Sequence, residues 1–248
     1  RIMNIQLKDM VKRFGALEAV SHVSLDIKDG ELFTLLGPSG CGKTTILRLI
    51  GGFHKADSGA IYFGDREVSA IPPYERNIGM VFQNYALFPH LTVRDNVAYG
   101  MEVKGFSKEK LEQRLKYILD LVGLTSTAHL YPNQVSASMV QRITVARAFA
   151  VDPDLLLMDE PYGQLDVKLR YYLEDELVRI WEKFKNTVIF VTHNIEEAVY
   201  LADRILILSN KPTTIKGNLV VDLPRPRDYL DPRFMAIREE VTDMIRWW

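Results

Sequence analysis

A glycine-rich segment, residues 37–44, constrains the fold of this chain more than any other feature. It reads GPSGCGKT, follows a short apolar run at 32–36 and precedes apolar residues at helical spacing. In this strand–loop–helix context the pattern G-x-x-x-x-G-K-[ST] forms a phosphate-binding loop, whose backbone N–H groups turn toward phosphate oxygens. We therefore expect Lys43 to reach the β- and γ-phosphates of a nucleotide and Thr44 to ligate Mg²⁺.

The remaining pattern predicts an α/β fold with a mostly parallel sheet. Apolar, strand-like runs alternate with helical stretches in the second half of the chain, at residues 155–158, 188–191 and 205–208. Such alternation favours parallel strands. The first 30 residues predict antiparallel strands, at 4–8 and 22–27, and the stretch of roughly 85–150 predicts an inserted helical lobe.

Two carboxylates end the apolar run at residues 155–158. Asp159 can hold Mg²⁺, usually through water, and Glu160 can polarise an attacking water. An ordinary acidic turn is the competing interpretation. The phosphate loop weakens that interpretation, because ligands bind at the carboxyl ends of parallel strands. Gln83 and His193 also follow predicted strands, although neither is specific alone.

Composition narrows the classes of function. With 31 basic and 32 acidic residues the net charge is −1, so the basic excess typical of nucleic-acid binding is missing. We expect no nucleic-acid partner. No apolar run approaches the roughly 18 residues of a membrane span, so a membrane role would depend on partner subunits.

In their order along the chain, these motifs resemble the nucleotide-binding subunits of ABC transporters over nearly the whole sequence. The order is phosphate loop, glutamine loop (81–83), signature (135–142), Walker B strand (155–160), D-loop (163–166) and switch histidine, His193. The resemblance implies a P-loop NTPase core with an N-terminal antiparallel β subdomain and an inserted α-helical subdomain. It also implies a head-to-tail dimer, in which each ATP lies between one phosphate loop and the other subunit's signature.

The resemblance implies a role for each motif residue. Glu160 is the general base, His193 contacts the γ-phosphate, and Gln83 senses Mg²⁺ and the water. Phe14 stacks on adenine, with burial in the N-terminal sheet as the competing interpretation. The implied ATP-binding residues are Phe14, Gly37, Ser39, Gly40, Cys41, Gly42, Lys43, Thr44, Thr45, Gln83 and Asp159, and Mg²⁺ is held by Thr44, Gln83 and Asp159, partly through water. The residues implied to face the partner's ATP are Ser136, Ala137, Ser138 and Met139 of the signature and Asp166 of the D-loop.

The signature and the D-loop depart from the family pattern. The signature is usually Leu-Ser-Gly-Gly-Gln or Leu-Ser-Gly-Gly-Met and here reads VSASM, and the D-loop reads GQLD in place of Ser-Ala-Leu-Asp. If Ala137 or Ser138 needs a positive φ, a non-glycine residue costs on the order of 1 kcal/mol or more. Loss of one aligned donor would slow the reaction about a hundredfold. We therefore expect slow hydrolysis by a homodimer, and an assembly that contains a subunit of intact signature or depends on membrane partners.

The type of transporter is less constrained. Residues 72–89 resemble sugar and polyamine importers, and the tail at 222–228 resembles the nitrate, sulfonate, taurine and bicarbonate importer group. We expect an importer of a small solute at the cytoplasmic face of the membrane, with a second ATPase subunit, permease subunits and a solute-binding protein as partners. The alternatives are a hydrolytically weak subunit of a heterodimer and a non-transport ABC ATPase.

Three further expectations concern organisation and local chemistry. We divide the single domain, 1–248, into a RecA-like core with an antiparallel β lobe (1–84 and 151–223), a helical signature lobe (85–150) and a tail (224–248). The apolar loop at 84–91 would flank a groove for a permease helix, with packing of Leu87 and Phe88 under the helical lobe as the alternative. The thiol of Cys41, near a helix N-terminus, is expected to react with thiol reagents unless Mg-ATP protects it.

Overall fold

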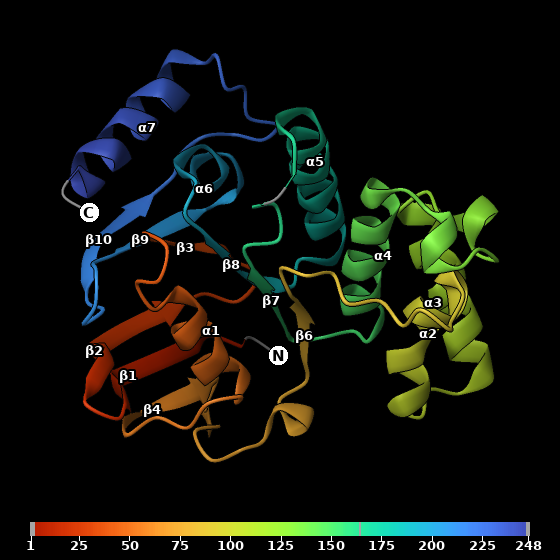
Figure 1. Cartoon of the computed structure of the whole chain (residues 1–248), viewed down its shortest axis with the longest axis horizontal. Helices are drawn as coiled ribbons and strands as arrows, with labels where there is room; N and C mark the ends of the chain where they lie inside the picture. Colours follow the sequence, from red (N-terminus) through yellow and green to blue (C-terminus); the bar gives the residue numbers. More distant parts are fainter. Residues whose placement is uncertain (1–2, 164, 247–248) are drawn as a thin grey trace.

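The larger of two sheets forms the centre of the fold (Figure 1). The computed structural model describes residues 3–163 and 165–246. The six strands follow the order β10-β9-β3-β8-β7-β6, and all neighbours are parallel except β10 and β9. They are β3 (Leu32–Leu36), β6 (Ile78–Val81), β7 (Leu155–Asp159), β8 (Thr187–Thr192), β9 (Arg204–Leu208) and β10 (Ile215–Val220). Strands β3 and β8 are buried on both faces, which explains their continuous apolar sequences.

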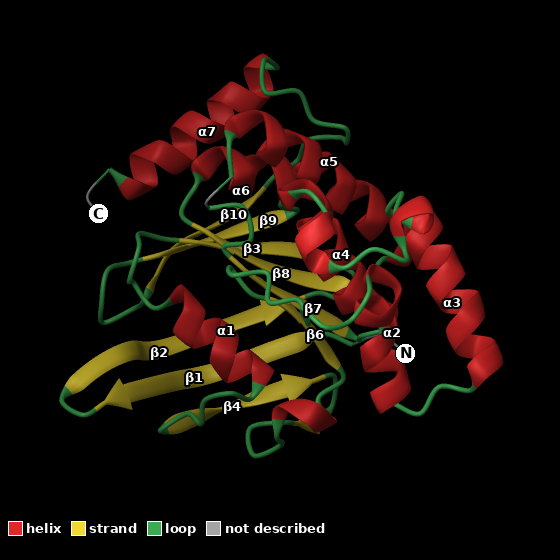
Figure 2. Ribbon diagram, turned by 45° about the vertical axis from the view of Figure 1, so that its right-hand side comes forward, coloured by secondary structure: helices red, strands yellow, loops and turns green. Residues whose placement is uncertain are grey.

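The smaller sheet is antiparallel and packs, with α1 (Lys43–Gly51), against one face of the central sheet (Figure 2). Its strands are β1 (Ile5–Phe14), β2 (Leu17–Ile27), β4 (Ser58–Phe63) and β5 (Arg66–Glu67), in the order β2-β1-β4-β5. Strands β1 and β2 are longer than predicted. Asp9 has a φ of 52°, and register shifts on both sides of Met10 interrupt the alternation that sequence reasoning relies on.

Helices cover the other face of the central sheet and form a lobe beyond β6 (Figures 1 and 2). The covering helices are α5 (Val167–Phe184), α6 (Ile195–Leu201) and α7 (Pro232–Ile245). The lobe holds α2 (Val93–Val103), α3 (Lys108–Leu121) and α4 (Ala137–Ala150). Short 3₁₀ helices occur at Pro73–Glu75, Thr125–Thr127 and Pro132–Gln134. The predicted fold class is confirmed.

The sequence pattern predicts a helix over 141–150, and α4 begins four residues earlier, at Ala137. Ser136 precedes it in extended conformation, and its hydroxyl accepts a hydrogen bond from the N–H of Met139 at 3.4 Å. A serine in this position satisfies one of the free N–H groups of the first turn, so the helix includes Ala137 and Ser138.

Among the described residues, no helix is long and apolar enough to cross a membrane.

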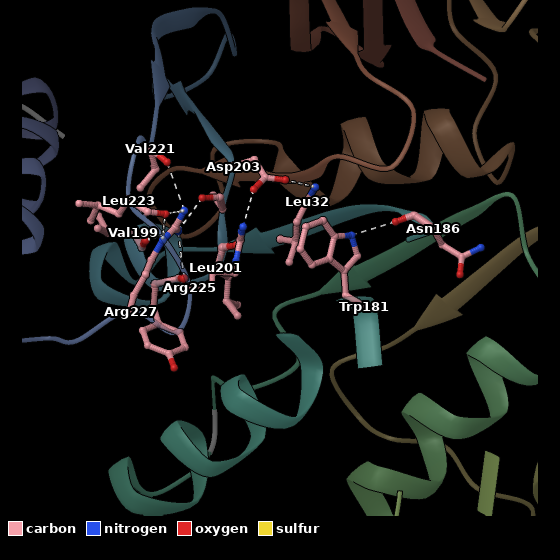
Figure 3. Close-up of polar contacts among 12 residues, drawn as sticks. Leu32, Trp181, Asn186, Val199, Leu201, Asp203, Val221, Leu223, Arg225 and Arg227 are labelled. Carbon is pink, nitrogen blue, oxygen red and sulfur yellow. Dashed lines mark hydrogen bonds and ion pairs between the residues drawn. The ribbon is translucent and has the colours of Figure 1, made fainter. Parts of the chain in front are cut away.

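Arg227 fastens the segment between β10 and α7 to the end of α6 (Figure 3). It is buried, and it donates to the carbonyl oxygens of Val199, Tyr200 and Ala202 at 2.7, 3.0 and 2.6 Å. The last carbonyl groups of a helix lack partners within it, so the guanidinium satisfies groups that burial would otherwise leave unpaired. Burial lowers the pKa of Arg227 to about 10, so it stays charged at neutral pH.

A second arginine links the same segment to the central sheet. Arg225 pairs with Asp203 at 2.6 Å, and the other oxygen of Asp203 accepts a hydrogen bond from the N–H of Leu32 at 3.0 Å (Figure 3). The guanidinium also lies over the ring of Trp181, 4.7 Å from its centroid. The tail is therefore bonded to α5, α6 and the start of β3.

Candidate active site

The phosphate loop joins β3 to α1 at the carboxyl edge of the parallel strands. Gly42, which precedes α1, has a φ of 116°, and a Cβ there would lie 2.4 Å from the hydroxyl oxygen of Thr213. Only glycine combines that backbone with so close an approach. Within the described residues no side chain caps α1, so the first N–H groups of the helix are available to an anion.

Lys43 is buried and bonded on three sides. Its ammonium donates to the carbonyl oxygens of Gly37 and Pro38, each at 2.8 Å, and lies 3.2 Å from a carboxylate oxygen of Glu160. The phosphate loop and the end of β7 are therefore joined through this side chain.

Thr44 and Asp159 form a second link between the same two segments. The hydroxyl of Thr44 donates to Asp159 Oδ1 at 3.0 Å. Burial raises the pKa of Asp159, and the hydrogen bond from Thr44 opposes that rise. A carboxylate in such a place gains from a nearby cation, because burial penalises its unpaired charge.

Glu160 lies between two basic side chains. Besides Lys43, it contacts His193, whose Nδ1 is 3.1 Å from the other carboxylate oxygen. Its own N–H donates to the carbonyl of Val191 in β8 at 3.0 Å, and its φ is 45°. A left-handed backbone is unfavourable for glutamate by about 1 kcal/mol or more, and such strain is typical of functional sites.

Gln83 follows β6 and reaches the same region. A Cβ on Gly163 would lie 3.7 Å from the amide nitrogen of Gln83 and 3.9 Å from Glu160 Oε2, so both side chains border Gly163. The ends of β3, β6, β7 and β8 thus bring together the phosphate loop, Gln83, the two carboxylates and His193. The arrangement can bind a phosphate, hold a hard cation through oxygen ligands and accept a proton from water.

Phe14 ends β1, away from this edge. Its ring is 45% exposed and meets His54 edge-on, with centroids 5.4 Å apart. His54 follows the C-terminus of α1, whereas the phosphate loop lies at its N-terminus. The competing interpretation of Phe14 as a core residue is therefore wrong, because nearly half of the side chain is accessible.

The signature does not join the site within this chain, and of the described D-loop residues only Gly163 borders it. In Figure 1, α4 lies on the far side of β7 from α1. Ser136 bonds within its own turn, to the N–H of Met139 and to Ser138 Oγ at 3.0 Å. Asp166 caps α5 by accepting from the N–H of Leu169 at 3.0 Å, and Gln164 of the D-loop lies outside the described residues.

Two expectations drawn from the sequence change, one about the signature and one about the phosphate loop. Ala137 and Ser138 are both helical, and neither has a positive φ, so the backbone strain considered for them does not arise. The prediction of a reactive Cys41 is wrong. The side chain is 2% exposed, and burial raises its pKa, with Lys43 and then Lys211 opposing that effect.

Sequence reasoning missed one basic residue at this edge. A hollow of about 180 Å³ beside the phosphate loop is lined by Gly40, Gly42, Lys43, Thr44, Thr45, Glu160 and Lys211. Lys211 belongs to the turn between β9 and β10, and β10 itself was not predicted. The predicted strand at 205–208 could have placed Lys211 near the phosphate loop, because the turn after a parallel strand lies at the same edge of the sheet as that loop.

The phosphate loop, the paired carboxylates and the histidine at one sheet edge define a P-loop nucleoside triphosphatase. The model of the ABC transporter family matches residues 20–163, more than half of the chain. The chain belongs to the ABC transporter family, as its ordered motifs predicted, and it is an ATPase of that family.

Relatives and solved structures agree with this assignment. A putative ATP-binding protein of Brucella abortus (strain 2308) is 43% identical over 240 residues, 96% of this chain and 91% of that protein. The sulfate/thiosulfate import ATP-binding protein CysA 2 of Agrobacterium fabrum is 43% identical over 246 residues, 98% of this chain and 72% of that protein. The Fe(3+) ions import ATP-binding protein FbpC of Fusobacterium nucleatum is 43% identical over 226 residues, 91% of this chain and 59% of that protein.

Among solved structures, the dimeric bacterial ABC transporter cassette MJ0796 matches with a TM-score of 0.76 at 31% identity, over 89% of this chain and all of that one. A second match, with a TM-score of 0.75, is a dimeric post-hydrolysis state of the same cassette bound to ADP and Pi. The finer assignment to the nitrate and sulfonate importer group stays a prediction.

Proposed function

We propose that this chain is the ATP-hydrolysing subunit of an importer of a small solute. It works as a dimer on the cytoplasmic side of permease subunits, and a solute-binding protein delivers the solute to those subunits. The observation that carries the proposal is the bonded set of Lys43, Thr44, Asp159, Glu160 and His193 at one sheet edge. Import is supported by the names of the sulfate/thiosulfate and Fe(3+) relatives.

Each side chain of this set has a separate role in binding or hydrolysing ATP. Lys43 exchanges its ion pair with Glu160 for the β- and γ-phosphates, because the triphosphate carries more negative charge than one carboxylate. Glu160 is then free to accept the proton of the attacking water. His193, already 3.1 Å from Glu160, orients that carboxylate and contacts the γ-phosphate. Gln83 orients the water.

The residues present fit a magnesium ion. Thr44 Oγ1 and Asp159 Oδ1 are 3.0 Å apart, and both are oxygen ligands of the kind that Mg²⁺ prefers. Gln83 borders Gly163, as Glu160 does, and is proposed to reach the ion through water. When bound, Mg²⁺ neutralises charge on the phosphate oxygens.

A second subunit completes each ATP site in this proposal. The side chains of Ser136 and Ser138, with Ala137, Met139 and the D-loop residue Asp166, face the ATP of the partner, while Phe14 stacks on the adenine of this chain's own ATP. Two facts support this division: α4 presents free N–H groups away from the chain's own phosphate loop, and the similar cassettes of known structure are dimeric. The division into core, helical signature lobe and tail is part of the same proposal.

The permease is proposed to dock in an apolar hollow between β6 and the helical lobe. The hollow, of about 380 Å³, is lined by Ile78, Gly79, Met80, Phe82, Ala86, Phe88, Tyr99, Gly100, Arg147, Ala148 and Val151. Phe82 and Tyr99 are more than 40% exposed there, which suits a short apolar helix. Leu87 packs against the core and the ring centroid of Phe88 lies 4.6 Å from that of Tyr99 in α2, so both residues also make the contacts that the alternative interpretation of the loop at 84–91 describes.

Replacement of Glu160 by Gln tests the catalytic proposal. We expect Glu160→Gln to bind ATP at least as tightly as the parent chain, because Lys43 no longer gives up an ion pair to bind the phosphates. Turnover should fall by about two to four orders of magnitude, because the amide cannot accept the proton. ATP binding and phosphate release are measured on the chain assembled with its permease. Glu182→Gln, an exposed change of the same kind on α5, is the control. Turnover of Glu160→Gln near the parent rate would exclude Glu160 as the base.

A further inference from the structure

Lys211 lines the same small hollow as the phosphate loop and Glu160, and it reaches that hollow from the strand on the other side of β3. We propose that its ammonium contacts the phosphate chain of the bound nucleotide, as a second cation beside Lys43. This inference rests on the proposed placement of ATP on the phosphate loop. It adds a segment, the turn between β9 and β10, to the parts of the chain that recognise the nucleotide.

The strand register brings the turn to the phosphate loop. Strands β3 and β9 are parallel neighbours, and Leu36 at the end of β3 lies opposite Ile207 near the end of β9. Both strands therefore end at the same edge, where β3 leads into the phosphate loop and β9 into the turn. On the other side of β3 are β8 and then β7, which carry His193, Asp159 and Glu160. The phosphate loop therefore lies between the end of β9, which leads to Lys211, and the end of β7, which carries the two carboxylates.

Thr213 holds this turn against the phosphate loop. Its side chain is fully buried, and its hydroxyl donates to the carbonyl of Cys41 within the loop. Its N–H donates to the carbonyl of Ala19 at 3.1 Å, and its own carbonyl accepts from the N–H of Ser21 at 3.0 Å. The backbone two residues from Lys211 is therefore fixed, while the lysine side chain is exposed and able to move.

The charge of Lys211 is not committed to another group. Lys211 lines the hollow of about 180 Å³ that the phosphate loop also lines, yet within the described residues no carboxylate lies within 4.0 Å of its ammonium. Lys43, in contrast, is already 3.2 Å from Glu160. A flexible ammonium at the edge of an anion site acts as a point charge for a phosphate oxygen.

The expected effect is moderate, because Lys211 is exposed and solvent screens its charge. We expect Lys211→Ala to weaken ATP and ADP binding about three- to tenfold and to leave adenosine binding unchanged. Lys211→Glu should weaken ATP binding further, and Lys211→Arg should retain it. The losses should shrink as ionic strength rises.

Calorimetric titration of the full chain with ATP, ADP and adenosine tests the inference. Lys216→Ala is the matched control, because Lys216 is an exposed lysine on β10 of the same hairpin and lies outside the hollow. Thermal unfolding confirms that each variant is folded. ATP affinity of Lys211→Ala within twofold of Lys216→Ala would overturn the inference, and so would an equal loss for adenosine. Lys43→Ala separates the two proposals: if it binds ATP as the parent does, the placement of ATP itself is wrong.

Discussion

The carboxyl edge of the central sheet and the N-terminus of α4 differ in how their polar groups are engaged. At the sheet edge, side chains from separate segments bond one another: Lys43 and His193 both contact Glu160, and Thr44 bonds Asp159. At α4, Ser136 bonds to groups of its own turn. The first region is assembled by the fold of one chain. The second is a set of donors directed away from it.

This difference supports the proposal that the two regions of one chain contribute to two different ATP sites. A phosphate loop with its acids and histidine can bind and activate a nucleotide, whereas a helix N-terminus with a serine can only complete a site supplied by another molecule. Variants in the two regions should therefore lose different properties. Variants at the sheet edge should lose either affinity for the chain's own ATP or the rate of its hydrolysis, whereas variants of the signature should lose turnover alone.

The largest contrast is expected from a negative charge on the signature. Ser136→Glu should lower turnover by about a hundredfold or more, because a carboxylate replaces a donor opposite the partner's phosphates. The ATP affinity of the isolated chain should stay within about twofold of the parent value, since Ser136 does not contact the phosphate loop of its own chain. Ser126→Glu, an exposed change in the same lobe, is the control. A loss of ATP affinity in Ser136→Glu alone would erase the distinction between the two regions.

The second prediction concerns the scaffold of the sheet edge. Arg227→Ala should lower the free energy of unfolding by about 2–3 kcal/mol, because it leaves the carbonyls at the end of α6 buried without donors. Denaturant unfolding measures the change, and Arg233→Ala, an exposed arginine at the start of α7, is the control. If both variants unfold at the same denaturant concentration, the tail does not stabilise α6 and the histidine before it.

The third prediction concerns Cys41. In the native chain at mildly alkaline pH, Cys41 should react with a thiol reagent about tenfold more slowly than an exposed cysteine, because burial raises its pKa and blocks access. The Lys216→Cys variant provides both thiols in one chain, and mass spectrometry of digested protein separates their rates. Similar rates would show that the phosphate loop opens far more often than its bonding indicates.

The smallest effect is expected from restoring glycine to the signature. Because Ala137 and Ser138 adopt helical backbone angles, the double change Ala137→Gly with Ser138→Gly relieves no strain and should raise the ATPase rate by no more than about threefold. A gain near the hundredfold considered from the sequence would show that the added Cβ atoms obstruct the partner's phosphate, and would favour a heterodimer with a subunit of intact signature.

The catalytic edge was predictable because its parts are local. The phosphate loop, the Walker B carboxylates and the switch histidine each follow a short apolar strand, and the ends of parallel strands meet at one edge. Helix α4 and the longer β1 were harder, since a serine cap and the irregular register around Asp9 and Met10 do not alter the apolar pattern clearly.

What sequence reasoning missed depends on contacts between distant segments. The burial of Cys41 and the position of Lys211 both follow from the turn between β9 and β10, where Thr213 bonds to Cys41 across 172 residues of chain. The apolar pattern of neither segment predicts that contact. The proximity of Lys211 to the phosphate loop therefore became visible only in the folded chain.

The central claim is that each ATP site combines the sheet edge of one subunit with the signature of another, and mixing two variants tests it directly. Glu160→Gln and Ser136→Glu should each be nearly inactive alone. In a mixed dimer one site would pair an intact Glu160 with an intact Ser136, so combining equal amounts should restore roughly a quarter of the parent rate. No recovery, with both variants folded and able to bind ATP, would contradict the account.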